Sequence, residues 1–108
     1  MKKTIAVLCV TILLLSIPLA GLAWEEIHKR MYIVTGGGSL NLRISNDRTS
    51  TIILYANNNQ PVTATRYDSS VGMYYLLKVK GTKSGGATAV ENGWAVEEYL
   101  KPESQIGR

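Results

Sequence analysis

Turn-forming residues recur about every ten positions after residue 30, and they leave only short segments between them. The turn signals are residues 36–38, 45–47, 57–59, 68–72 and 81–87. Gly, Asn, Asp and Ser favour turns because they tolerate left-handed backbone or hydrogen-bond to their own backbone. Segments this short suit strands better than helices. The spacing therefore predicts an all-β domain after residue 30.

The segments between these turns have the composition of strands. Residues 31–35, 51–55 and 74–80 are rich in β-branched and aromatic side chains, and residues 39–43 alternate apolar and polar. A further strand begins at Pro61, where Val62 and Ala64 are expected to face inward. With the closing segment, five or six short strands predict a small barrel or sandwich.

The segment 74–80 is the longest of these predicted strands. Alternation puts Tyr75, Leu77 and Val79 on one face, and Leu76 with Lys78 on the other. Leu77 is therefore expected in the core.

Residues 1–23 have the three parts of a secretory signal peptide. Lys2 and Lys3 form a basic start, an uncharged apolar run follows, and Gly21 and Ala23 precede a cleavage site after Ala23. Cleavage predicts an exported periplasmic or extracellular domain of residues 24–108. The alternative is an uncleaved inner-membrane anchor, because about 20 apolar residues can span a bilayer.

Charge and cysteine content argue against several classes of function for residues 24–108. Without Lys2 and Lys3, ten basic and eight acidic residues remain, and they form no basic stripe with interleaved aromatics. A nucleic-acid partner is therefore not expected. The one cysteine, Cys9, lies in the apolar run, so residues 24–108 have no thiol for a disulfide, a nucleophile or a zinc site.

The stretch Gly93-Trp94-Ala95-Val96-Glu97-Glu98-Tyr99-Leu100 is expected to close the domain as a strand, a turn and an aromatic plug. Pro102 then stops further pairing. Asn92-Gly93 is also a signal for a two-residue hairpin. Such a hairpin would pair Val90 with Ala95 and put Trp94 on the core face.

Two segments resemble the sequence pattern of the bacterial Src-homology-3 (SH3) type domain. Leu40-Asn41-Leu42-Arg43 is similar to that family's opening Leu-Asn-Val-Arg segment. Residues 93–100 are similar to its closing Gly-Trp-Val, three variable residues and Tyr-Leu. The likeness covers about residues 32–102, and the domain core is expected at about residues 31–102.

This resemblance implies a five-stranded SH3-like barrel with one short 3-10 turn near the C-terminus. It also implies that Ala95 is buried and that Trp94 faces outward, which opposes the hairpin interpretation.

The residues suggest no catalytic set. His28 is the only histidine and lies in a charged segment, residues 24–30, that is too short for an independent helix and is expected to be a lead-in. Glu25-Glu26 and Glu97-Glu98 are adjacent pairs whose side chains point apart in extended chain, which does not suit shared-proton chemistry. Metal-ligand spacing is missing as well. We expect a protein that is not an enzyme and needs no metal or cofactor.

Recognition by aromatic side chains is the remaining prediction. Trp and Tyr give rigid contact area with a polar handle, and the candidates are Trp94, Tyr99, Tyr74 and Tyr67. The alternative is that these rings complete a thin core. The resemblance implies an exported module that binds a peptide or a cell-wall (peptidoglycan) ligand. A structural or regulatory envelope protein, docking on another protein as a subunit or inhibitor, is the alternative function.

Overall fold

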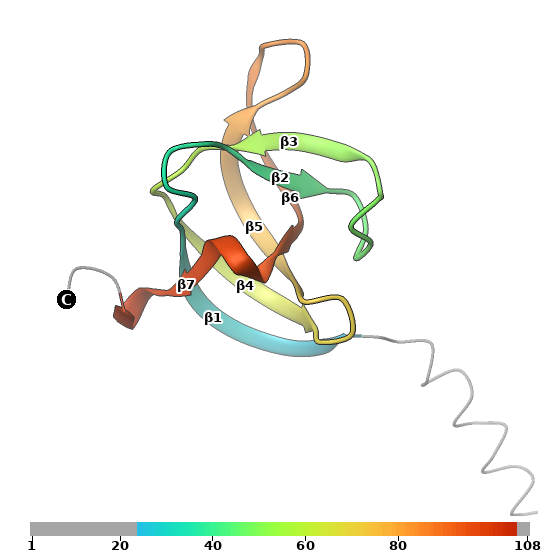
Figure 1. Cartoon of the computed structure of the whole chain (residues 1–108), viewed down its shortest axis with the longest axis vertical. Coiled ribbons are helices and arrows are strands. Elements are labelled where there is room, and N and C mark those ends of the chain that lie inside the picture. Colours follow the sequence, from blue (N-terminus) through green and yellow to red (C-terminus); the bar gives the residue numbers. More distant parts are fainter. Residues whose placement is uncertain (1–23, 106–108) are drawn as a thin grey trace, which may run out of the picture.

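The computed structural model describes residues 24–105, which form one antiparallel sheet of seven strands (Figure 1). The strands are β1 (Glu25–Ile33), β2 (Leu40–Arg43), β3 (Ile52–Ala56), β4 (Pro61–Asp68), β5 (Met73–Thr82), β6 (Thr88–Val96) and β7 (Leu100–Pro102). The single-turn 3-10 helix η1 (Glu97–Tyr99) joins β6 to β7, and η2 (Glu103–Gln105) follows. The all-β prediction and the short 3-10 turn are confirmed, but the described residues form seven strands where five were predicted.

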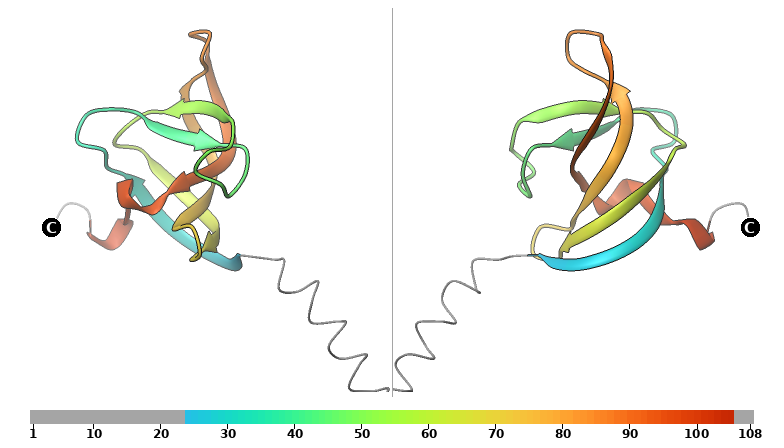
Figure 2. Two further views of the ribbon diagram at one scale, coloured as in Figure 1. Left: turned by 45° about the vertical axis from the view of Figure 1, so that its right-hand side comes forward. Right: turned by 180° about the vertical axis from the view of Figure 1, so that it is seen from behind.

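The sheet curls around a common interior, as Figure 2 shows from two sides. Its strand order is β3-β2-β6-β5-β4-β1-β7, and β3 also pairs with β5. At this second pairing Ala56 lies opposite Gly81. A Cβ on Gly81 would lie 2.8 Å from the Ala56 Cα, so the close approach of β3 to β5 requires a glycine.

The interior is filled by inward-facing side chains from all seven strands. Leu40 and Leu42 of β2 face inward, as do Val62 and Ala64 of β4, in agreement with the alternation in the sequence. The other members of this core are Met31, Ile33, Leu54, Ala56, Leu76, Val79, Ala95 and Leu100. Burial of this apolar surface is the main stabilising contribution to a domain of this size.

A β-bulge in β5 overturns the predicted face of Leu77. Lys78 has a left-handed φ of 53°, and the pairing of β5 with β6 shifts between Leu76 and Val79. Leu76 and Val79 therefore both point into the core and are 0% exposed, whereas Leu77 is half-buried. Strict alternation fails here because the bulge inserts an extra residue into the strand.

The Asn92-Gly93 pair lies inside a strand, so the predicted hairpin is wrong. β6 runs without a turn from Thr88 to Val96. Asn92 accepts a hydrogen bond at its side-chain oxygen from the backbone N–H of Lys78, at 2.8 Å, and so caps the bulge. A Cβ on Gly93 would lie 2.8 Å from the carbonyl oxygen of Arg43. This glycine serves close packing of β6 against β2, not a turn.

The N-terminal part of the domain differs from the predicted lead-in. Residues 25–30 belong to β1 and pair with β4, with an irregularity between Glu26 and Lys29. Their polar composition fits a strand of which one face and part of one edge are exposed. The predicted signal peptide, residues 1–23, lies outside the described residues. Within residues 24–105, no helix has the length and hydropathy of a membrane span.

Candidate binding groove

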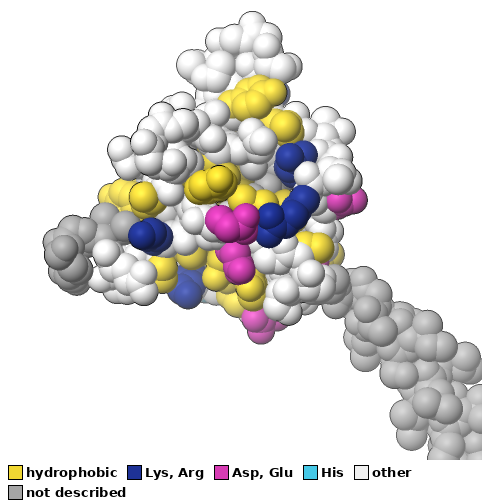
Figure 3. Space-filling model, viewed as in Figure 1, with side chains coloured by type: hydrophobic (Ala, Val, Ile, Leu, Met, Phe, Trp, Pro, Cys, Tyr) yellow, Lys and Arg dark blue, Asp and Glu magenta, His cyan; other side chains and the backbone are white. Residues whose placement is uncertain are grey.

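A groove of ≈ 490 Å³ lies between β2, the preceding loop and η1. It is lined by Thr35, Gly38, Ser39, Leu40, Asn41, Arg43, Arg48, Val96, Glu98 and Tyr99. Figure 3 shows this face of the molecule, on which acidic and basic side chains adjoin near its middle and hydrophobic side chains lie beside them. The groove therefore offers both apolar contact and charged groups.

The groove opens where β6 leaves β2. The two strands pair at a single position, Arg43 opposite Trp94. Beyond Trp94 the chain turns into η1, and Glu97 donates its backbone N–H to the carbonyl oxygen of Gly72 at 2.9 Å. Leu40 and Asn41 of β2 therefore border the groove, because β6 does not pair with β2 at these positions.

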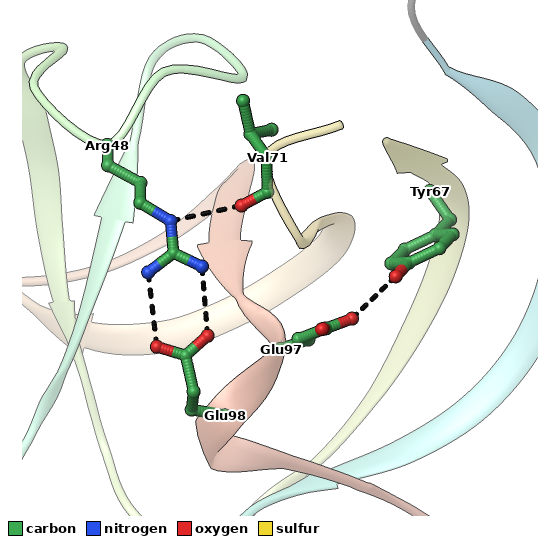
Figure 4. A network of polar contacts seen from close by, with 5 residues as sticks. All are labelled: Arg48, Tyr67, Val71, Glu97 and Glu98. Atoms are coloured by element: carbon green, nitrogen blue, oxygen red, sulfur yellow. Dashed lines mark hydrogen bonds and ion pairs between the residues drawn. The ribbon is translucent and has the colours of Figure 1, made fainter. Parts of the chain in front are cut away.

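A forked ion pair forms one wall of this groove (Figure 4). The guanidinium of Arg48 donates to both carboxylate oxygens of Glu98, at 2.9 and 3.1 Å, and to the carbonyl oxygen of Val71 at 3.0 Å. These bonds hold the pKa of Glu98 below its ordinary value. The pair is exposed and stabilises little by itself, but it joins the loop after β2 to η1.

The loop that carries Arg48 is also fixed by a buried carboxylate. Asp68, at the end of β4, is 1% exposed and accepts from the Asn46 amide at 2.6 Å and from the Ser70 hydroxyl at 2.5 Å. Burial alone would raise the pKa of Asp68, but hydrogen bonds from Ser70, Asn46 and Val71 outweigh it and hold the pKa below its ordinary value.

We expect the domain to lose stability in acid because of Asp68. A folded-state pKa below the unfolded one stabilises the fold above the unfolded value, and this contribution disappears as the pH falls through the folded value. The free energy of unfolding should therefore decrease from about pH 4 downward. Asp68→Asn should cost about 1–2 kcal/mol at neutral pH and make the acid decrease shallower. Urea titrations at several pH values measure both effects, and an unchanged acid slope in the variant would contradict this role of Asp68.

Of the four aromatic candidates, Tyr99 alone lines the groove. It is 45% exposed, and its backbone carbonyl accepts a hydrogen bond from Val34 at 2.8 Å. The backbone of η1 is thereby fixed to the segment after β1 while the ring stays accessible.

Trp94 lies on the face of the sheet opposite to Ala95, in agreement with the resemblance, but it is not exposed. Only 4% of its surface is accessible, because the rings of Trp24 and Tyr75 pack against it with centroid distances of 5.6 and 5.4 Å. The Arg66 guanidinium lies over both of these rings, 5.2 and 4.8 Å from their centroids. The expectation of an uncovered Trp94 on a binding rim is therefore wrong.

Tyr67 and Tyr74 lie together at a third place, away from the groove and from Trp94. Their ring centroids are 4.5 Å apart, and the Tyr67 hydroxyl donates to Glu97 at 2.6 Å. The structure thus brings two of the four candidates together and places Tyr99 and Trp94 elsewhere. The groove residues Asn41, Arg48 and Glu98 were not predicted, because nothing local in the sequence indicates that the loop after β2 meets η1.

The described residues contain no group of three or more His, Cys, Asp or Glu side chains that could hold a metal ion. Comparison with known protein families, curated proteins and solved structures found no match to this chain.

Proposed function

We propose that this chain is an exported, non-catalytic binding module with an SH3-like barrel, and that it recognises a peptide or cell-wall ligand in the groove between β2 and η1. The observation that carries the proposal is the groove itself, with the accessible Tyr99 ring on one side and the exposed Asn41 amide on the other. Export is proposed from the order of basic start, apolar run and small residues in residues 1–23.

An extended peptide suits this groove because of the position of β2. The strand pairs with β3 along its whole length, while on its other side Leu40 and Asn41 border the groove. A peptide that lies along such an edge can form main-chain hydrogen bonds and place alternate side chains in contact with the walls. The stem peptides of peptidoglycan are ligands of this kind.

Replacing Tyr99 by alanine tests the groove. Loss of an accessible aromatic anchor should weaken binding to purified sacculi about tenfold, in the range of an interface hot spot. Stability should change by less than about 1 kcal/mol, as for a surface substitution. The matched control is Val90→Ala, because Val90 is 57% exposed and does not line the groove.

Two results of this assay would reject a cell-wall ligand. Either Tyr99→Ala binds sacculi like the unaltered protein, or neither form is retained. Capture of one envelope protein in place of sacculi, lost in Tyr99→Ala, would favour docking on a protein partner through the same groove.

The export proposal has a separate test. The exported product should begin at Trp24 when its N-terminus is sequenced, because cleavage is expected after Ala23. A product in the membrane fraction that keeps Met1 would instead be an anchored protein.

A further inference from the structure

A second hollow, of ≈ 350 Å³, is lined by Glu25, Ile27, His28, Lys29, Tyr67 and Tyr74. It shares no lining residue with the groove, and Glu97 of η1 accepts a hydrogen bond from Tyr67, one of its lining residues. In Figure 4 the side chains of Glu97 and Glu98 leave η1 in different directions, Glu98 towards Arg48 and Glu97 towards Tyr67.

The sheet register places the aromatic and acidic residues of this hollow side by side. Glu25 of β1 lies opposite Tyr67 of β4, and Tyr67 lies opposite Tyr74 of β5. Directly opposed residues of antiparallel strands project from the same face. One carboxylate and two rings tilted against each other therefore form a continuous row across three strands.

The row is electrically negative. Glu97 accepts the Tyr67 hydroxyl proton in a hydrogen bond, which raises the pKa of Tyr67 to about 12. Burial raises the pKa of Tyr74, and the charges of Glu97 and Glu25 raise it further. Both phenols are therefore neutral at pH 7, and both rings lie in the field of two carboxylates.

Basic groups also lie near this hollow, and the charge of Glu97 acts on the Arg48 guanidinium of the neighbouring groove. Lys29 and His28 line it too, but among residues 24–105 no ion pair joins either of them to Glu25 or Glu97. Arg66 pairs instead with Glu26, at 3.8 Å, and packs on the aromatic rings of the opposite face.

We propose that this hollow binds a primary ammonium group on an aliphatic stem, such as a lysine side chain. The ring faces of Tyr67 and Tyr74 attract a cation through their quadrupoles. Glu25 at the hollow and Glu97 behind the Tyr67 hydroxyl add charge attraction, and the partly buried Ile27 contacts the methylene stem. This site does not depend on the peptide groove.

Titration with Nα-acetyl-lysine methylamide tests the site by amide chemical shifts in ¹⁵N-labelled protein. Saturable shifts should appear at Glu25, Tyr67 and Tyr74, with a Kd on the order of 1 mM, as expected for a small fragment with a few contacts. The Nα,Nε-diacetyl analogue has the same stem without the charge and should give no saturable shifts.

Two charge-removing variants locate the interaction. Glu25→Gln and Glu97→Gln should each weaken binding about threefold, as for partly exposed charge pairs, and a glutamine at 97 still offers an oxygen to Tyr67. The matched control is Glu91→Gln, which removes a carboxylate that pairs with Lys83 away from this hollow.

Three outcomes would overturn the proposal. They are equal binding of the neutral analogue, unchanged affinity in both Gln variants, and shifts confined to the groove around Tyr99. Because Tyr99→Ala leaves this hollow intact, lysine binding that survives in that variant separates the two sites.

Discussion

Replacing Trp94 by alanine is expected to lower the free energy of unfolding by about 3 kcal/mol, at the lower end of the range for large aromatic residues that are buried. The side chain is almost completely covered although it lies outside the core cluster. Its removal would leave a cavity between Trp24 and Tyr75. Arg66 would also lose part of the packing of the rings on which it lies.

Urea unfolding followed by far-ultraviolet circular dichroism measures this loss without relying on the fluorescence of the removed ring. Tyr99→Ala is the control, because it truncates an accessible aromatic residue of the same closing segment. The decrease in its free energy of unfolding should stay below about 1 kcal/mol. A loss below 1 kcal/mol for Trp94→Ala as well would mean that Trp24 does not cover this ring in solution.

The packing of Trp94 shows what the sequence could predict and what it could not. The closing motif correctly placed Ala95 in the core and Trp94 on the opposite face. It could not show that Trp24, at the other end of the domain, lies on this ring. That contact depends on the pairing of β1 with β4, which puts Trp24 on the same face as Arg66, Tyr75 and Trp94, and no local pattern in residues 24–30 indicates such pairing.

Of the residues that line the candidate groove, only Tyr99 was among the predicted candidates. Tyr99 was singled out as a candidate from its type and its place in the closing motif, and it lines the groove. Arg48 was not, because it is one charged residue in a loop of polar residues. Its role follows from a long-range contact, the forked pair with Glu98, and such contacts depend on the whole fold.

Strand periodicity succeeded within the regular part of a strand. It gave the inward positions of Leu40, Leu42, Val62 and Ala64, and it failed in β5, where the bulge at Lys78 interrupts the alternation. The failure has a local cause, since Lys78 adopts a left-handed φ that non-glycine residues seldom adopt. The Asn92 side chain satisfies the Lys78 N–H that the ladder leaves unpaired. A bulge of this kind depends on a side chain of the neighbouring strand and is invisible in the segment 74–80 alone.

The bulge also predicts that alanine substitutions at two neighbouring leucines, Leu76 and Leu77, lower the stability by different amounts. Leu76→Ala is expected to cost about 3 kcal/mol, because a fully buried leucine leaves a cavity when truncated. Leu77→Ala should cost about 1 kcal/mol, because Leu77 is half-buried on the other side of the strand. Denaturant midpoints of the two variants, measured under the same conditions, give the difference directly.

The order of these two losses decides between the bulged and the regular strand. In a regular strand Leu77 would share the inward face with Val79, and Leu77→Ala would then be the more damaging change. In the bulged strand Leu76 and Val79 face inward together, so Leu76→Ala is the more damaging one. Asn92→Ala should reduce the difference between these two stability losses, because it removes the acceptor for the Lys78 N–H. With Asn92→Ala as background, a smaller gap between the leucine variants would show that Asn92 holds the bulge, whereas an unchanged gap would assign the bulge to core packing alone.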